Sequence, residues 1–339
     1  MPTALTIDSR FRDHDPGPGH PERPDRIAVL LDLVEHWRGA RLERIAARHA
    51  EESELRRVHT ETLVDRVRAT TGRARHHLDA DTPTSADSFA TALLAAGGVC
   101  ELVDAVAGGA AQNGFALVRP PGHHATRDTA MGFCLFNNVA IAAERLRHEH
   151  HLERVAIVDW DVHHGNGTQD IFLGDPGVLY VSTHQSPFYP GTGAVGEVGV
   201  GDGEGFTINL PFSPGVGDAG YLLAFEEIVR PILRQFAPEF VLVSAGFDCH
   251  HRDPLGGMAV TEEGFAGMTQ ILLDVARETA GGRLVAVLEG GYDLDAIRES
   301  TEAVLGELTH ERAPRVVAET RTPGFEKAKQ LFRKYWQLD

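Results

Sequence analysis

The chain has 339 residues, of which 42% are hydrophobic, and it carries a formal net charge of −17. It is long enough to bury a large core, and its length alone allows one domain or two. The negative charge argues against nucleic acid or an anionic membrane as the main partner, because both require neutralising lysine and arginine. It favours cationic substrates, although acidity for solubility alone explains the charge equally well.

The lack of a recognisable targeting signal and the small number of cysteines predict a cytoplasmic protein. No window approaches the ~20 apolar residues needed to span a bilayer, and the N-terminus lacks the basic and then apolar layout of a secretory signal. The only cysteines are Cys100, Cys134 and Cys249. Three cysteines in a chain of this size argue against a disulfide framework, so we expect the reducing cytoplasm.

Helical and strand patterns alternate along the chain. Apolar residues recur at helical spacing in some windows, whereas others are short apolar runs typical of strands buried on both faces of a parallel sheet. In chain order, we expect a helix at residues 27–34, strands at 115–118 and 155–158, a helix at 221–236, a strand at 240–243, a helix at 265–275, a strand at 284–288 and a helix near 325–336. This order predicts an α/β fold, a single-domain three-layer α/β/α sandwich with a mostly parallel sheet. The segment from about residue 309 is expected to be a helical extension packed on that domain.

The segment at residues 191–205 is rich in glycine and is the one candidate linker. Residues 191–196 also satisfy the dinucleotide-binding pattern G-x-G-x-x-G, which requires a strand directly before it and a helix directly after it. Tyr189 and Pro190 precede it and more glycine follows, which argues against a nucleotide site. Because polar clusters on both sides must meet to form one site, we expect a surface loop within a single domain.

Each predicted strand is followed at once by polar residues. The four clusters lie at residues 119–124, 159–169, 244–248 and 289–292. Open α/β sheets bind ligands at the carboxyl ends of their strands. A lone aspartate at such a place is more often a turn former, and a lone histidine more often a satisfied polar residue, but four clusters of suitable type predict a common site.

The second cluster begins with Asp159, Asp161 and His163 at alternating positions. In an extended segment such side chains share a face, so they are expected to converge. A catalytic zinc ion takes three protein ligands and keeps a fourth position for water. Asp161 and His163, together with Asp248 from a neighbouring strand end, supply such a ligand set.

The other clusters supply groups for proton transfer. His123 and His124 follow a stiff proline-rich turn that can direct both imidazoles toward a metal-activated water. Asp159 and Asn166 are placed to fix the histidine tautomers. Tyr292 lies beside two glycines and offers a phenol to a tetrahedral oxyanion.

With these motifs the chain resembles the zinc-dependent histone deacetylase family, of the class II type that includes bacterial histone deacetylase-like amidohydrolases and acetylpolyamine amidohydrolases. The matching segments span about nine tenths of the chain in the family's order. They are residues 20–24, 119–125, 132–134, 159–169, 244–248, 253–257 and 289–292.

The resemblance implies a zinc-dependent hydrolase that removes acetyl or other acyl groups from lysine side chains. It makes Asp161, His163 and Asp248 the ligands of one zinc ion, although iron is conceivable in the cell. It makes His124 the main proton-transfer group, while His123, supported by Asp159, tunes the electrostatics. Asparagine at residue 166 is the class II pattern, and this neutral partner implies a lower pKa for His124 than an aspartate would give. Tyr292 implies a competent enzyme, because relatives with histidine there are poor deacetylases.

The resemblance also assigns substrate contacts. Phe133 and, less directly, Tyr189 match the aromatic walls around the acyl-lysine stem, with the Gly132 carbonyl available to the substrate amide. Leu255 stands where polyamine-selective relatives have glutamate, which favours acyl-lysine over acetylpolyamine. Potassium ions are implied at two structural sites, one using Asp159, Asp161, His163 and Ser182, and the other near Phe172, Asp175, Val178 and Phe206.

Three alternatives stay open at this point. The first is an acetylpolyamine deacetylase. The second is an arginase-like enzyme with two manganese ions, although the residues after His163 and Asp248 lack the extra carboxylates that a second metal needs. The third is a protein that binds acyl-lysine or polyamine without hydrolysing it, although neither Tyr292 nor a tandem histidine is lost. Two tightly bound manganese ions per chain would favour the arginase-like enzyme. Full zinc occupancy without turnover would favour the binding protein.

Overall fold

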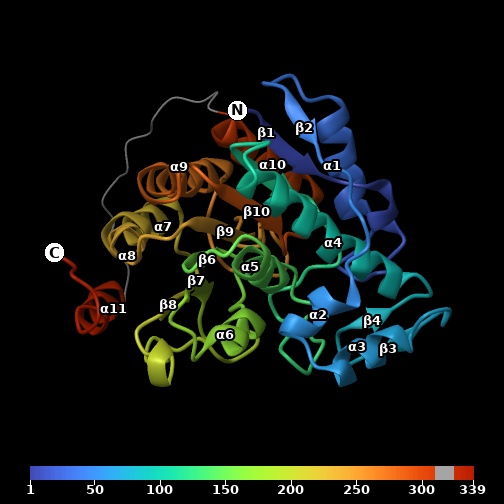
Figure 1. Cartoon of the computed structure of the whole chain (residues 1–339), viewed down its shortest axis with the longest axis horizontal. Helices are drawn as coiled ribbons and strands as arrows, with labels where there is room; N and C mark the ends of the chain where they lie inside the picture. Colours follow the sequence, from blue (N-terminus) through green and yellow to red (C-terminus); the bar gives the residue numbers. More distant parts are fainter. Residues whose placement is uncertain (310–323) are drawn as a thin grey trace.

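The computed structural model describes residues 1–309 and 324–339 (Figure 1). Its main sheet has eight strands in the order β2-β1-β5-β10-β9-β6-β7-β8, and all neighbouring strands are parallel. These strands are β1 (Thr3–Thr6), β2 (Leu42–Arg44), β5 (Asn113–Ala116), β6 (Val155–Asp159), β7 (Val178–Gln185), β8 (Thr207–Phe212), β9 (Phe240–Ala245) and β10 (Leu284–Leu288). The short strands β3 (His76–His77) and β4 (Pro83–Thr84) form a separate antiparallel pair.

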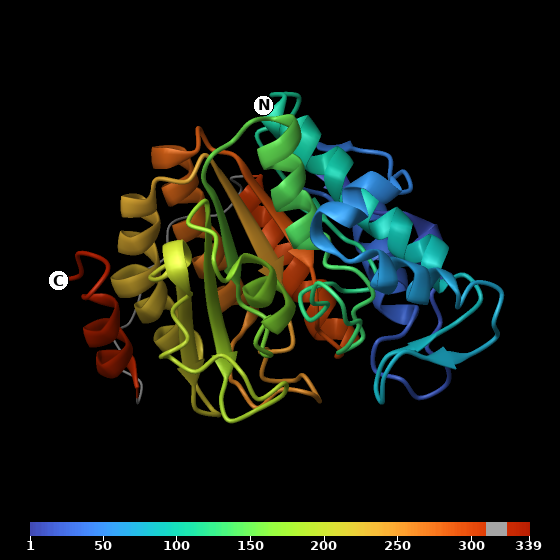
Figure 2. The ribbon, with the colours of Figure 1, turned by 60° about the horizontal axis from the view of Figure 1, so that its bottom comes forward.

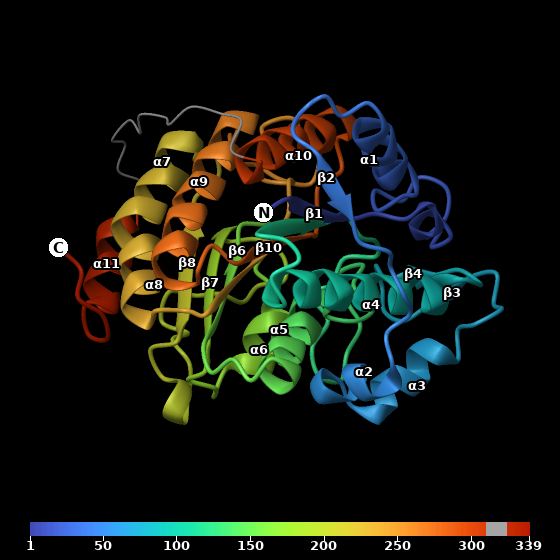
Figure 3. The ribbon, with the colours of Figure 1, turned by 45° about the horizontal axis from the view of Figure 1, so that its top comes forward.

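Helices cover both faces of the main sheet (Figure 3). The described helices are α1 (Asp25–Glu35), α2 (Glu52–Val58), α3 (Glu61–Arg68), α4 (Ser88–Ala107), α5 (Asn138–Glu149), α6 (Asn166–Phe172), α7 (Asp218–Ala224), α8 (Arg230–Phe236), α9 (Glu262–Thr279), α10 (Leu294–Leu308) and α11 (Phe325–Phe332), with short 3-10 turns η1 (Ser9–Arg12) and η2 (Gly201–Gly203). Helices α1, α10, α9 and the α7–α8 pair lie on one face, and α4, α5 and α6 lie on the other. The predicted α/β sandwich with a mostly parallel sheet is confirmed.

Burial explains why the inner strands are continuous apolar runs. Every residue of β6, β9 and β10 is buried, so neither face of these strands alternates with polar residues. The helices instead bury one stripe. In α1, for example, Ile27, Leu30, Leu33 and Val34 are buried. Thr261 caps the first turn of α9 by accepting a hydrogen bond from the Glu263 amide.

One expectation about membrane-spanning segments is wrong. Helix α4 has 20 residues and is apolar enough, by length and composition alone, to cross a bilayer. It is mostly buried, and it packs against β1, β5 and α5. A core helix of a sheet-based fold passes the same compositional test, because its neighbours cover it on most sides.

The helix predicted at residues 221–236 is interrupted. Helices α7 and α8 are joined by a π-helical turn, η3 (Phe225–Val229), without a break in the chain direction. A π turn uses i→i+5 hydrogen bonds and so shifts the apolar stripe by one residue. The buried residues Tyr221, Phe225, Ile228 and Ile232 still face the core.

The C-terminal helix α11 falls within the range expected for a helix near the end of the chain. Of the extension expected from about residue 309, residues 310–323 lie outside the described part. Helix α11 packs beside the edge strand β8 and the α8 side of the molecule (Figures 1 and 3). Lys329 pairs with Glu227 at 2.7 Å, and the Trp336 indole donates to the Gly205 carbonyl at 2.9 Å.

The strands followed by polar clusters are neighbours in the sheet. The order β5-β10-β9-β6 places their carboxyl ends side by side, and long connecting loops gather at that edge (Figure 2). The glycine-rich segment at residues 191–205 is one of these connections, between β7 and β8, and no α-helix directly follows the G-x-G-x-x-G pattern. The topology therefore collects all four clusters at one place.

Candidate active site

Asp161, His163 and Asp248 lie together between the ends of β6 and β9. One ligand atom from each lies within 4.8 Å of the others. The Nδ1 atom of His163 is 3.1 Å from a carboxylate oxygen of Asp161 and 3.0 Å from one of Asp248. Both carboxylates are buried and the imidazole is nearly so. This donor set fits a catalytic zinc ion, which needs three such ligands and one open position.

Two glycines give the carboxylates their space. A Cβ atom at Gly246 would lie 2.0 Å from an Asp161 oxygen, and one at Gly290 would lie 2.2 Å from an Asp248 oxygen. The Gly290 amide donates to Asp161 at 2.9 Å, and the Val162 amide donates to Asp248 at 2.9 Å. The backbone thus orients both carboxylates toward His163, and larger residues at the two glycines would displace them.

The geometry after β6 differs from the expected extended segment. Strand β6 ends at Asp159, and the carboxylate of Asp159 accepts a hydrogen bond from the Asp161 amide at 3.1 Å. Asp161 in turn accepts from the His163 amide at 2.9 Å. The prediction that Asp159, Asp161 and His163 share one face of an extended segment is therefore wrong beyond Asp159. Two successive aspartate turns place the side chains of Asp161 and His163.

The buried charges of the ligand group strongly affect one another. Burial, and then repulsion from Asp161, raise the pKa of Asp248 to about 7. Burial opposes protonation of His163, but its hydrogen bonds to Asp161 and Asp248 outweigh this effect and raise its pKa to about 10. A divalent cation among these three side chains would offset the repulsion between the two carboxylates.

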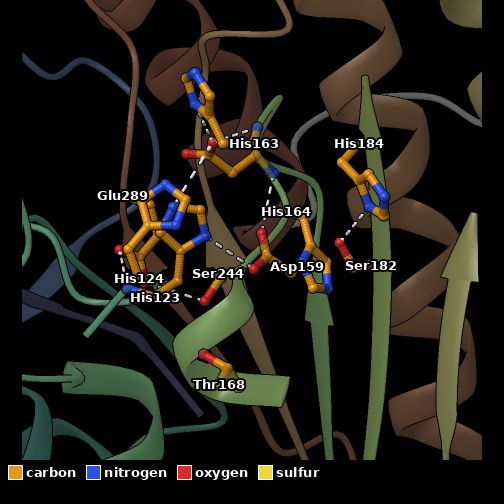
Figure 4. A network of polar contacts seen from close by, with 12 residues as sticks. His123, His124, Asp159, His163, His164, Thr168, Ser182, His184, Ser244 and Glu289 are labelled. Carbon is orange, nitrogen blue, oxygen red and sulfur yellow. Dashed lines mark hydrogen bonds and ion pairs between the residues drawn. The ribbon is translucent and has the colours of Figure 1, made fainter. Parts of the chain in front are cut away.

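The tandem histidines lie directly beside this group (Figure 4). The ring centroids of His123 and His124 are 4.1 Å apart, and those of His124 and His163 are 5.8 Å apart. The Nδ1 atom of His123 is 3.0 Å from the Asp159 carboxylate, and Nδ1 of His124 is 2.8 Å from the Asn166 side-chain oxygen. Each histidine therefore has the separate partner that the sequence analysis assigned to it.

The two histidines have opposite pKa shifts. Burial disfavours the charged form of His123, but Asp161 and Asp159 outweigh it and raise its pKa. Burial also lowers the pKa of His124, and the positive charges of His123 and His163 lower it further. The opposite directions favour a charged His123 beside a neutral His124, which is a division of roles suited to acid–base chemistry.

Asp159 has a partner that the sequence did not reveal. The Tyr180 hydroxyl on β7 donates to the Asp159 carboxylate at 3.0 Å and lies 3.1 Å from the Gly165 carbonyl. Tyr180 is buried inside an apolar strand. A buried phenol needs a hydrogen-bond partner. The signal in the sequence was therefore a tyrosine in the strand that follows the acidic residues at the end of β6, which could supply that partner.

Tyr292 is held at the edge of the ligand group by its backbone. The Asp253 carboxylate accepts hydrogen bonds from the Tyr292 amide at 2.6 Å and the Asp293 amide at 3.2 Å. The Arg26 guanidinium donates to the Gly291 carbonyl at 2.6 Å and lies over the Tyr292 ring at 5.0 Å. Burial, and then Asp248, raise the pKa of Tyr292, so its phenol stays protonated and can donate.

Arg26 was missed because its role depends on partners remote in sequence. It pairs with Glu22 at 2.9 Å and is fully buried. Arg26, Leu30 and Leu33 all lie on the buried face of α1. An arginine in helical register with buried leucines is the signal that could have identified it.

Aromatic rings surround the ligand group. Phe133 contacts the Tyr292 ring edge-on at 5.9 Å, and Tyr189 lies 5.1 Å from His124 in the same manner. Phe188, which the sequence analysis did not single out, stacks on His163 at 5.3 Å with an interplanar angle of 16°. Both Phe188 and Tyr189 are 36% exposed, so the rings that contact His163 and His124 reach solvent.

The Gly132–Phe133 turn is shaped to fit His124. Gly132 has φ 57° and Phe133 has φ 67°, and a Cβ at Gly132 would lie 2.4 Å from the His124 ring. The left-handed conformation of Phe133 is unusual for a residue with a side chain. Hydrogen bonds from the Gly132 amide to Asp81 and from the Phe133 amide to Thr82 hold it in place.

Of the remaining predicted residues, Leu255 lies at the same edge of the sheet, Ser182 lies inside β7, and the second potassium set lies near the amino ends of β7 and β8, at the opposite edge. Leu255 is half-buried in the loop after Asp248, and its amide donates to Asp253 at 2.9 Å. Ser182 pairs in register with Asp159 on the neighbouring strand. The second potassium set follows α6: the Asp175 amide donates to the Phe172 carbonyl, the Val178 amide to the Asp175 carbonyl, and the Tyr180 amide to the Phe206 carbonyl.

All three cysteines are free and buried. Cys134 donates to the Gly132 carbonyl at 3.3 Å, and Cys249 to the Trp160 carbonyl at 3.3 Å. Burial raises the pKa of both thiols, so neither is a thiolate at neutral pH. The site is therefore one of carboxylates, imidazoles and a phenol.

Comparison with known proteins agrees with this geometry. The family model described as "Histone deacetylase domain" matches residues 20–308. A "Probable deacetylase" of Archaeoglobus fulgidus is 38% identical over 99% of each chain. "Histone deacetylase 15" of Arabidopsis thaliana is 44% identical over 95% of this chain, and "Polyamine deacetylase HDAC10" of Homo sapiens is 46% identical over 86%. The chain spans 59% and 45% of the lengths of these last two relatives.

A solved structure of a related protein has the same fold as this chain. "Crystal Structure of HDA15 HD domain" superimposes with a TM-score of 0.92 and 41% identity, covering 99% of this chain and 95% of that one. Family model, full-length archaeal relative and structure agree with one another. The chain therefore belongs to the histone deacetylase family and is a deacetylase.

Proposed function

We propose that this chain binds one zinc ion through Asp161, His163 and Asp248 and hydrolyses the acetyl amide of N-acetylated lysine side chains. The observation that carries this proposal is the Asp–His–Asp ligand group beside two histidines with opposite pKa shifts. Neither feature alone requires hydrolysis. Together they provide a metal position, a base and an electrostatic partner within one buried site.

Proton transfer is proposed for His124. A zinc ion at the ligand group would polarise the substrate carbonyl and lower the pKa of a bound water. The Asn166 side-chain oxygen can only accept, so it fixes the hydrogen of His124 on Nδ1 and leaves Nε2 free as a base. His124 then takes a proton from the attacking water and passes it to the leaving amine.

Charge stabilisation is proposed for His123 and Tyr292. The His123 imidazolium, held by Asp159, keeps a positive charge next to His124 and favours the neutral form of that base. The Tyr292 phenol donates to the oxyanion that forms when the amide carbonyl is attacked. Because burial and then Asp248 raise its pKa, the phenol keeps this proton at neutral pH.

Asn166→Asp is expected to move the acid limb of the pH profile of kcat/KM upward by about one unit or more. A carboxylate beside His124 stabilises its imidazolium and raises its pKa. Because the base must be neutral, activity is then lost at a higher pH as the pH falls. Gln112→Glu, which adds the same charge at the opposite end of β5, should leave the limb in place. A limb that stays or moves downward in Asn166→Asp would contradict the role of His124.

We propose acyl-lysine rather than acetylpolyamine as the preferred substrate because of Leu255. Gly256, the next residue, approaches the Asp248 carbonyl so closely that a Cβ there would lie 2.0 Å away. Leu255 directly precedes this close approach and contributes a half-buried apolar side chain to the loop. A polyamine carries further ammonium groups along its chain, and an apolar neighbour offers them no compensating charge.

Leu255→Glu should raise the ratio of kcat/KM for acetylpolyamine over acetyl-lysine peptide by about tenfold, equal to about 1.4 kcal/mol. The introduced carboxylate would pair with the additional ammonium groups of the polyamine. Rates on both substrates are measured in competition for the wild type, Leu255→Glu and the uncharged control Leu255→Gln. Equal ratios for the two variants would show that charge at this position does not set the preference.

The same assay on the wild type tests the proposed substrate. Rates on acetyl-lysine peptides, acetylpolyamines and longer acyl-lysines should be highest for acetyl-lysine. A higher kcat/KM on acetylpolyamine would support the alternative function of the polyamine deacetylase among the relatives. Full zinc occupancy with no turnover on any of them would support a binding protein instead.

We also propose potassium ions as structural partners. Asp159, Asp161, His163 and Ser182 would form one site, since Ser182 on β7 pairs in register with Asp159 and the turns after β6 carry Asp161 and His163. The turn between α6 and β7 would form the other, near the Asp175 carbonyl. Increased thermal stability in potassium over sodium at equal ionic strength would support these sites.

A further inference from the structure

Glu289 is a buried carboxylate to which the mechanism above assigns no role. It directly follows β10, is 0% exposed, and lies beside the tandem histidines (Figure 4). One of its oxygens accepts hydrogen bonds from the Gly122 amide at 2.6 Å and the His123 amide at 3.1 Å. The other oxygen accepts from the Ser244 hydroxyl at 3.0 Å. All three donors lie in loops or strand ends of the site.

The backbone of Glu289 is fixed as firmly as its side chain. Its amide donates to the Ala245 carbonyl at 3.2 Å, and its carbonyl accepts from the Arg26 guanidinium. The next amide, of Gly290, donates to the Asp161 carboxylate. The segment therefore connects the metal ligand Asp161 on one side with the turn that carries the tandem histidines on the other.

This arrangement is unusual for a purely structural carboxylate. Burying a charged group is unfavourable unless hydrogen bonds compensate, and two of the three available here come from the Gly122–His123 turn. A Cβ atom at Gly122 would lie 2.5 Å from the Asn138 amide, so the turn is also confined from the opposite side. The Gly122–His123 turn thus lies between α5 and the Glu289 carboxylate. A shift of the carboxylate would therefore shift the turn.

We propose that Glu289 is a positioning residue that sets the distance of His123 and His124 from the metal ligands, through hydrogen bonds to the Gly122 and His123 amides. This inference rests on the proposed hydrolytic function. In the described part of the chain the Glu289 side chain hydrogen-bonds to Gly122, His123 and Ser244, and not to the three ligand side chains. Its acceptor oxygens, rather than the packing of its methylenes, hold the turn. Loss of the acceptor therefore affects the chemical step more than substrate binding.

Four variants separate these effects. Glu289→Met retains the length but has no strong acceptor, and kcat on an acetyl-lysine peptide should fall by about 10- to 100-fold, with KM changed less than about threefold. Glu289→Asp is one methylene shorter and cannot reach both amides, so a similar loss is expected. Glu289→Gln keeps an oxygen for the two amides and an NH₂ group for Ser244, and it should retain at least about a third of kcat. Ser244→Ala removes only the third hydrogen bond and should resemble Glu289→Gln.

Zinc content and thermal unfolding are measured for each variant, because a lost fold or a lost metal would also lower kcat. If Glu289→Met does not fold, the comparison of Glu289→Asp with Glu289→Gln tests the same point. Full activity in folded Glu289→Asp or Glu289→Met would overturn the inference, as would a loss in Glu289→Gln equal to that in Glu289→Met. An inactive wild type would instead refute the proposed function, so the two failures are distinguishable.

Discussion

Asp248→Ala is expected to abolish zinc binding and to lower kcat/KM on an acetyl-lysine peptide by about 10⁴-fold or more. In the proposed site Asp248 supplies one of three ligand atoms, and the remaining two ligands would not form a catalytic zinc site. The protein itself should remain folded. Burial and Asp161 raise the pKa of Asp248 to about 7, so its removal relieves repulsion in the metal-free protein and offsets the hydrogen bond lost at Val162.

Metal content by mass spectrometry and activity are measured on the same preparations. Asp274→Ala serves as the control, because it removes a carboxylate from α9 that pairs with Arg277 one turn away on the same helix. This control should retain one zinc ion and full activity. An Asp248→Ala protein that still deacetylates at more than about 1% of the wild-type rate would defeat the ligand assignment.

Tyr292→Phe is expected to lower kcat by about 10²- to 10³-fold, the loss typical of one missing oxyanion donor. KM and zinc content should change little, because the phenol is not a ligand and the ring contact with Phe133 at 5.9 Å is retained. Arg26 also still packs over the ring in this variant. The loss therefore belongs to the hydroxyl group alone.

Tyr335→Phe is the matched control for the removal of a phenol. Its hydroxyl donates to Glu204 at 2.8 Å on the C-terminal side of the molecule, away from the site. Kinetics and zinc content of both variants are compared with the wild type. Activity of Tyr292→Phe within about threefold of the wild type would mean that another group stabilises the oxyanion.

The inner strands of the sheet could be predicted because burial on both faces leaves a continuous apolar run. The predicted run at residues 284–288 coincides with β10, whereas the run at 115–118 lies two residues beyond the start of β5 (Asn113–Ala116). The polar Asn113 is paired in the sheet and buried, which no apolar pattern reveals. Outer strands such as β2 (Leu42–Arg44) are too short and too polar to stand out from loops.

The site residues could be predicted where a polar group directly follows a buried strand. Asp161, His163 and Asp248 were found in this way, and the structure brings them together. Arg26 and Tyr180 escaped because each acts on a residue more than 20 positions away in the sequence. Contacts of this kind become visible only when the tertiary fold is known.

The most direct test is a zinc titration of the metal-free wild-type enzyme. Deacetylation of an acetyl-lysine peptide should be absent before addition and should reach its maximum at one zinc ion per chain, with Fe²⁺ titrated in parallel. Asp248→Ala treated in the same way should stay inactive at every metal concentration. Activity in the metal-free enzyme, or a requirement for two manganese ions per chain, would contradict a single metal held by Asp161, His163 and Asp248.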